Sequence, residues 1–236
     1  TTGSFNVFIG DAAGDAVTTA DSNVAIGQNA LTNTTTGATN TAVGRQALQT
    51  NTTASHNTSI GNQSLLNNTT GTQNTAVGSI ALDSNTTANA NTALGYNALG
   101  ANTTGSDNNG IGWGALSSNT TGNSNVALGA ATLDANTTGA ANTAIGNSAL
   151  GANTTASNNV AVGFSALLSN TTASNNTAVG YQSADANTTG ENNASLGASS
   201  LGANTTGSSN TAIGMNALRD NTTASNNTAV GLNSLL

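Results

Sequence analysis

The chain contains no cysteine and no proline, and charged residues make up only 5% of its 236 residues. Without cysteine it can hold neither a disulfide framework nor a thiolate metal site. Arg45 and Arg219 are its only strong bases, whereas nucleic-acid binding requires clustered Lys and Arg. No apolar stretch approaches the ~20 residues that span a membrane as a helix. We therefore expect no nucleic-acid partner and no membrane segment in this chain.

Groups that could perform catalysis are also scarce. The single histidine, His56, has neither a cysteine nor an acid near it in sequence. Asp83, Asp134 and Asp185 recur 51 residues apart, and over three stacked coils their carboxylates would lie ~14 Å apart. The carboxylates of glycosidases lie roughly 5 to 9.5 Å apart, so this column does not form such a pair. We predict solvated turn acids, no cofactor, no metal site and no enzymatic activity.

What the chain does contain is a repeat. An Asn followed four residues later by a Gly recurs every 17 residues, from Asn6 and Gly10 to Asn227 and Gly231. A fixed period of this kind indicates stacked repeat units and argues against disorder. We predict one solenoid segment over residues 1–236, with a partial coil at 1–5, thirteen coils over 6–226 and a partial coil at 227–236. Because the chain begins and ends in mid-repeat, we expect it to be a piece of a longer protein.

The consensus of a unit is Asn-Thr-Ala-Val-Gly-x-x-Ala-Leu-x-x-Asn-Thr-Thr-Gly-x-x, and we number its positions 1 to 17. Short β-branched runs between Gly and Asn predict strands and turns, not helices. Strand alternation places positions 2 and 4 on one face and the small position 3 on the other. We expect the aliphatic residues of position 4 to face the inside of the coil. We expect the alanine column of position 3 to contact sister chains in an oligomer, and the Asn of position 1 to stack in a ladder.

Position 6 varies where its neighbours do not. It carries aromatic residues in two pairs of successive coils, at Tyr96 and Trp113 and at Phe164 and Tyr181. Each pair is expected to stack ~5 Å apart on an outward corner. Exposed aromatic rings bind sugars or partner surfaces. These four residues are our candidate surface-binding site, and burial of the rings at a seam between chains is an equal alternative.

The Asn-Thr-Ala-Val-Gly units, and the Asn-Val-Ala-Ile-Gly unit at 23–27, resemble the repeat of YadA-type head domains in trimeric autotransporter adhesins. They resemble more closely the longer repeats of bacterial and phage tail-fibre-like trimeric proteins. The resemblance covers essentially the whole chain. It implies an all-β fold, a left-handed parallel β-roll of about fourteen coils with three chains side by side, exposed outside the cell or on its surface. The adhesin-head repeat is shorter, the added stretch being Asn-Thr-Thr-Gly. A triangular left-handed β-helix is the second choice of fold.

These observations predict an extracellular structural and adhesive fibre segment. It would be a rigid homotrimeric rod that displays or forms a surface for attachment to a host, prey or substrate, with a glycan or cell-surface ligand as partner. The alternative function is an ice-binding β-solenoid with columns of Thr. The Thr residues of positions 13 and 14 are adjacent, as in Thr103-Thr104, so alternation sends them to opposite faces. We therefore expect only one outward Thr column from this segment.

Overall fold

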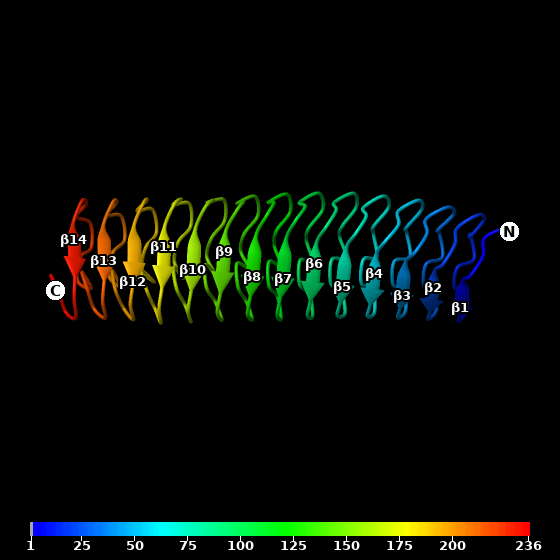
Figure 1. The fold of residues 1–236 in the computed structure, drawn as a ribbon, viewed down its shortest axis with the longest axis horizontal. Coiled ribbons are helices and arrows are strands. Elements are labelled where there is room, and N and C mark those ends of the chain that lie inside the picture. Colours follow the sequence, from blue (N-terminus) through cyan, green and yellow to red (C-terminus); the bar gives the residue numbers. More distant parts are fainter. Residues whose placement is uncertain (1) are drawn as a thin grey trace. The chain divides into compact units, whose positions relative to one another are not determined.

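The computed structural model describes residues 2–236, which form two compact units, the first ending at Thr121 and the second running from Gly122 to Leu236. Each unit contains seven strands of three residues, shown one after another in Figure 1. The strands of the first unit are β1 (Val7–Ile9), β2 (Val24–Ile26), β3 (Thr41–Val43), β4 (Thr58–Ile60), β5 (Thr75–Val77), β6 (Thr92–Leu94) and β7 (Asn109–Ile111). Those of the second are β8 (Val126–Leu128), β9 (Thr143–Ile145), β10 (Val160–Val162), β11 (Thr177–Val179), β12 (Ala194–Leu196), β13 (Thr211–Ile213) and β14 (Thr228–Val230).

Within each unit, every strand pairs in parallel with the next, in a register shifted by one repeat. Val77 lies opposite Leu94, for example, and Val162 opposite Val179. The strands are short because the glycine of position 5 follows each one with a positive φ, +141° at Gly78, a conformation that side chains disfavour. Each unit is therefore a parallel β-solenoid with one strand per 17-residue coil. The predicted period, strand positions and stacking are confirmed.

The core lies on the opposite side of the strands from the one we predicted. Ala76 of position 3, Ala81 of position 8 and Leu82 of position 9 are all fully buried, whereas Leu94 of position 4 is 47% exposed. The expectation that the aliphatic residues face inward and the alanines face sister chains is wrong.

The narrow interior explains the reversal. Position 3 is Gly110 in one coil, and a Cβ placed there would stand 3.2 Å from both Leu99 Cγ and the Ala115 carbonyl oxygen. The leucine of the preceding coil and the backbone of the same coil thus approach position 3 closely. Only a small residue fits beside the leucine column, so the branched side chains of positions 2 and 4 project outward.

Two columns of buried asparagine run through the coils. At position 1 the Asn57 Oδ1 accepts a hydrogen bond from the backbone N–H of Asn74 (2.9 Å), and Asn74 Nδ2 donates to the Ala88 carbonyl within its own coil (2.8 Å). At position 12 the amides bond one another directly, since Asn85 Nδ2 donates to Asn68 Oδ1 at 2.8 Å. The expected ladder at position 1 is confirmed, although it bonds mainly to backbone. Position 12 forms a second ladder that we did not predict.

Candidate binding surfaces

The outward positions 2 and 4 of the strands form a surface that we call the sheet face. The most exposed residues of position 4 have between 36% and 67% of their surface accessible, namely Ile9, Ile26, Ile60 and Leu94 in the first unit and Leu128, Ile145, Leu196, Ile213 and Val230 in the second. Position 2 carries Thr, Val, Ala or Asn, so neither column contains a charge. The sheet face of each unit is therefore an uncharged aliphatic stripe beside a mostly Thr and Val stripe.

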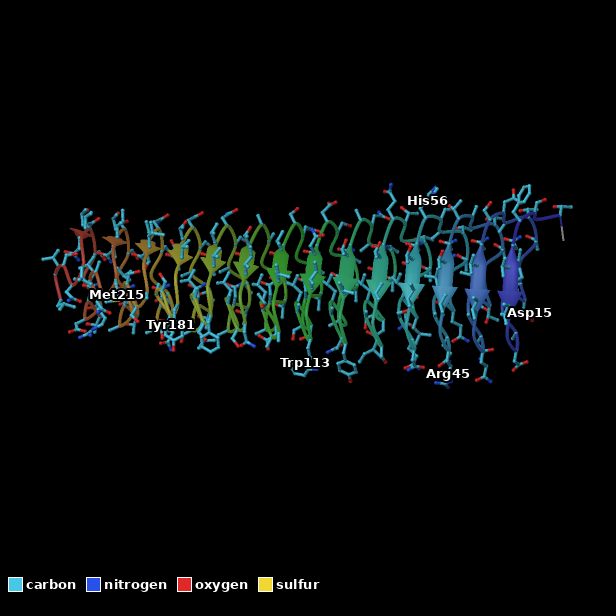
Figure 2. The ribbon with its side chains drawn as sticks, turned by 60° about the horizontal axis from the view of Figure 1, so that its bottom comes forward. Asp15, Arg45, His56, Trp113, Tyr181 and Met215 are labelled. Atoms are coloured by element: carbon cyan, nitrogen blue, oxygen red, sulfur yellow. The ribbon has the colours of Figure 1, made fainter. Side chains whose placement is uncertain are left out.

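Position 6 forms what we call the corner column, which follows the glycine at the end of each strand. In Figure 2 Arg45 and Trp113 project from the same edge of the first unit. The column carries Asp11, Gln28, Arg45, Asn62, Ser79, Tyr96 and Trp113 in the first unit, and Ala130, Asn147, Phe164, Tyr181, Ala198, Met215 and Leu232 in the second. Its aromatic side chains point outward, with Tyr96 52% and Trp113 63% exposed.

The two aromatic pairs differ in geometry. The rings of Phe164 and Tyr181 stack with centroids 5.6 Å apart and planes inclined by 12°, close to the expected spacing and favourable for offset stacking. Among the described residues no other ring pair stacks, so Tyr96 and Trp113 do not form the expected stack. The structure thus brings together two of the four candidate residues as one stacked apolar pair.

The three aspartates of position 10 are only partly exposed. Burial raises the pKa of Asp83, Asp134 and Asp185, and hydrogen bonds from nearby backbone partly oppose the shift. The predicted turn acids of this column are therefore only partly solvated. Asp134 lies beside Gly151 of the next coil, with Oδ1 3.6 Å from the place of a Cβ there.

The remaining charged groups lie on the surface. Arg219 Nε donates to Asp220 Oδ1 at 2.8 Å and forms an ion pair with it on the surface. Hydrogen bonding to this guanidinium lowers the pKa of the Asp220 carboxyl. Exposed pairs of this kind contribute little to stability. His56 is exposed, and its Nδ1 lies 2.8 Å from the hydroxyl of Thr39.

Within residues 2–236 no three His, Cys, Asp or Glu side chains gather in a way that could hold a metal ion. The same residues include no helix with the length and apolar character needed to cross a membrane.

The two Thr residues of positions 13 and 14 differ in exposure, as predicted. Thr103 is half-buried, with its hydroxyl donating to the Thr120 carbonyl at 3.0 Å, whereas Thr104 is exposed. This segment therefore supplies one outward Thr column. Outward residues at i and i+2 occur instead on the sheet face, where Thr75 and Val77 of β5 lie side by side on one surface.

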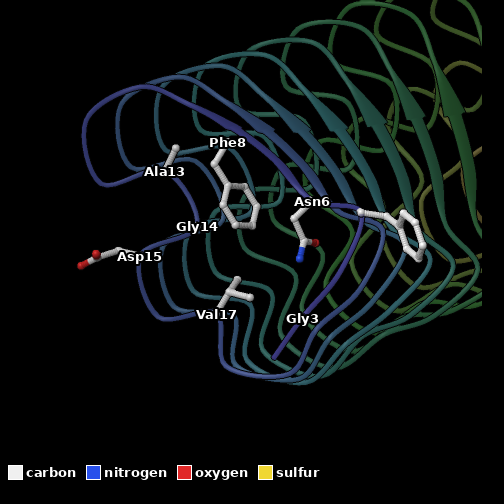
Figure 3. A pocket seen from close by; sticks show the side chains of 8 residues that line it. Gly3, Asn6, Phe8, Ala13, Gly14, Asp15 and Val17 are labelled. Carbon is white, nitrogen blue, oxygen red and sulfur yellow. The ribbon is translucent and has the colours of Figure 1, made fainter. Parts of the chain in front are cut away.

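A cavity of about 440 Å³ opens at the first coil of the first unit (Figure 3). The Phe8 ring stands over Gly14 in it, while Asp15 points away from it. The cavity is lined by Gly3, Phe5, Asn6, Phe8, Ala13, Gly14, Asp15 and Val17. It is the open end of the interior of the first coil.

The fold and these surfaces define a parallel β-solenoid with 17-residue coils and an uncharged outward sheet. Comparisons with protein-family models, with curated proteins and with solved structures gave no significant match.

Proposed function

We propose that this chain is a non-enzymatic, extracellular fibre segment with a structural and adhesive role, in which three copies associate through their sheet faces. Each unit would be a left-handed β-roll, as the resemblance to trimeric adhesins and tail fibres implies. The supporting observation is the exposed aliphatic column of position 4. It supports association through the side of the sheet opposite the alanine column.

The sheet face has the composition of a buried interface. Soluble monomers rarely expose contiguous apolar patches larger than a few hundred Å², and the cores of interfaces are depleted of charged residues. Here an aliphatic side chain occupies position 4 of all seven strands in each unit, with no charge at positions 2 or 4. Covering this column would remove an aliphatic stripe from water in every coil, at roughly 25 cal/mol per Å² of apolar surface.

The test is the solution mass of the chain. Sedimentation equilibrium is expected to give three times the chain mass of 22.7 kDa. Ile60→Asp combined with Ile145→Asp places a charge in the sheet face of each unit and should reduce the assembly to monomers. The matched control is Thr70→Asp with Thr155→Asp, which adds the same charges at exposed position 14 and should leave the trimer intact. A wild-type monomer would contradict the proposal.

Ice binding is the second candidate function, because the sheet face presents Thr and an aliphatic residue at i and i+2 in successive coils. Thr75 and Val77 pair in register with Thr92 and Leu94 of the next strand, giving a regular outward array at the ~4.8 Å strand spacing. A thermal-hysteresis assay tests it. Monomeric wild-type chain with hysteresis that Thr92→Lys abolishes would support ice binding, whereas a trimer without hysteresis would exclude it.

A further inference from the structure

The stacked pair Phe164–Tyr181 has the features of a ligand platform. Both rings are about half exposed and belong to the corner column of successive coils. The residues before and after them in that column are Asn147 and Ala198, whose side chains are too short to cover a six-membered ring. The stack therefore presents an apolar surface in which the two rings already pack against each other, and this packing lowers the cost of ordering them upon binding.

Hydrogen-bonding groups lie next to these rings. The Tyr181 hydroxyl and the Gln182 side-chain amide form no hydrogen bond within the part of the chain that the structure describes. The backbone holds Gln182 in place, because its N–H donates to the Phe164 carbonyl at 2.9 Å. Ser148 and Ser199 occupy position 7 in the neighbouring coils. An apolar platform with a few polar groups beside it is the usual composition of a small-molecule site.

The charge distribution restricts the ligand. Positions 4, 6 and 7 of the second unit contain no charged residue, and the whole chain carries a net charge of -7 with two strong bases. Anionic ligands are therefore repelled, and a cationic ligand finds no acid in these three columns. A neutral molecule with apolar C–H faces and several hydroxyl groups fits both the rings and the polar groups.

We propose that Phe164 and Tyr181 form a subsite for neutral glycans. A pyranose would place its C–H face against the face of the Tyr181 ring that is turned away from Phe164, and it would hydrogen-bond to the Tyr181 hydroxyl and the Gln182 amide. The proposal rests on the adhesive part of the proposed function and names its ligand class. It does not require that the chain be trimeric.

The first unit lacks the same combination. Tyr96 and Trp113 do not stack, and position 7 after Trp113 is Gly114, which has no side chain to bond a hydroxyl. The corner column there also contains the charged residues Asp11 and Arg45. Substitution of Trp113 should consequently change neutral-glycan binding far less than substitution of Tyr181.

The experiment is affinity electrophoresis of the full chain, in its native assembly, through gels containing dextran, mannan, galactan or laminarin, with alginate as the anionic control. At least one neutral polysaccharide is expected to retard the wild type, and alginate is not. Phe164→Ala and Tyr181→Ala should each weaken the apparent affinity at least tenfold, and Tyr181→Phe several-fold. Met215→Ala, in the same column two coils further on, is the matched control and should bind as the wild type does. Trp113→Ala tests whether the first unit contributes to neutral-glycan binding.

Three results would overturn the subsite. The first is that no neutral polysaccharide retards the wild type, and the second is that retardation persists in Phe164→Ala and Tyr181→Ala. The third is that either of these variants loses the mass of the assembly, because that loss would place the rings at a seam between chains. Measuring sedimentation on the same samples separates the two proposals. A monomer that binds glycan contradicts the trimer alone, and a trimer that binds none contradicts the subsite alone.

Discussion

Phe8 occupies the space that a side chain on Gly14 would fill. A Cβ placed on Gly14 would stand 2.7 Å from three ring carbons of Phe8. Phe8 is at position 3, which is small in every other coil, and Gly14 is at position 9, which is Leu in every other coil except at Ala184. The first coil therefore exchanges the sizes of the two residues that face each other across the interior.

This exchange predicts strong coupling between the two sites. Phe8→Ala leaves a void beside Gly14 and should destabilise the first coil by about 2 kcal/mol, less than a fully buried Phe would because the ring is partly exposed. Gly14→Leu alone forces a leucine against the ring and should also destabilise it. The double variant restores the arrangement of the other coils and should lie within about 1 kcal/mol of the wild type. Amide hydrogen exchange at Gly14, whose N–H bonds the Ala30 carbonyl, measures the first coil directly. Additive losses in the double variant would contradict the coupling.

The second prediction concerns the position 12 ladder. Asn85 Nδ2 donates to Asn68 Oδ1 and to the Ala88 carbonyl, and its Oδ1 accepts from Asn102 Nδ2 at 3.2 Å. Asn85→Asp removes both donors and turns a buried carboxylate toward the Asn68 oxygen, so we expect a loss of about 3 kcal/mol or more. Asn89→Asp is the control, because Asn89 is exposed and its Oδ1 acts as an acceptor from the Thr72 N–H. Urea unfolding of both variants checks this, and equal midpoints would show that the ladder contributes nothing specific.

The repeat frame and strand positions were predictable because they depend on residue types at a fixed spacing. Which face of the strand points into the coil was not predictable, because alternation separates the two faces without indicating which one is inside. Phe8 and Gly14 carried the missing signal. Their coil is the one in which the residue at position 3 is large, and in the same coil the residue at position 9 has no side chain. This exchange of sizes indicates that the two positions face each other.

The turn after position 6 was also beyond prediction. Leu99 of position 9 adopts φ +54°, as the leucines of this column do throughout, although left-handed backbone is unfavourable for a bulky residue. Burial of the leucine column within the coil maintains this conformation.

The Phe164–Tyr181 stack was predictable from spacing, whereas the different geometry of Tyr96 and Trp113 depends on side-chain conformations that spacing does not determine.

The position 10 aspartates predict a dependence of stability on pH. Burial raises the pKa of Asp134 and Asp185 above the ordinary value of 3.8, so the folded chain binds their protons more tightly than the unfolded chain does. Their contribution is therefore most favourable below pH 3.8 and is lost as pH rises through the folded-state values. Asp134→Asn with Asp185→Asn should raise the melting temperature at pH 7 and have a smaller effect at pH 3. Asp107→Asn, at an exposed position, is the control. An equal increase at both pH values would contradict this account.

The glycine of position 5 is the least replaceable residue of the coil. Gly78 has φ +141°, and a Cβ there would press against the carbonyl oxygen of Gly95 in the next coil. Because that oxygen belongs to backbone fixed by the coil stacking, it cannot move aside locally. Gly78→Ala should cost about 3 kcal/mol or more, from backbone strain and steric overlap together. Gly100→Ala is the matched control, since the nearest atom to a Cβ there belongs to the Asn97 side chain, which can rotate away, and it should cost less than about 1 kcal/mol. Denaturant unfolding followed by far-ultraviolet circular dichroism compares the two variants, and similar midpoints would show that the coils can separate enough to admit a side chain at position 5.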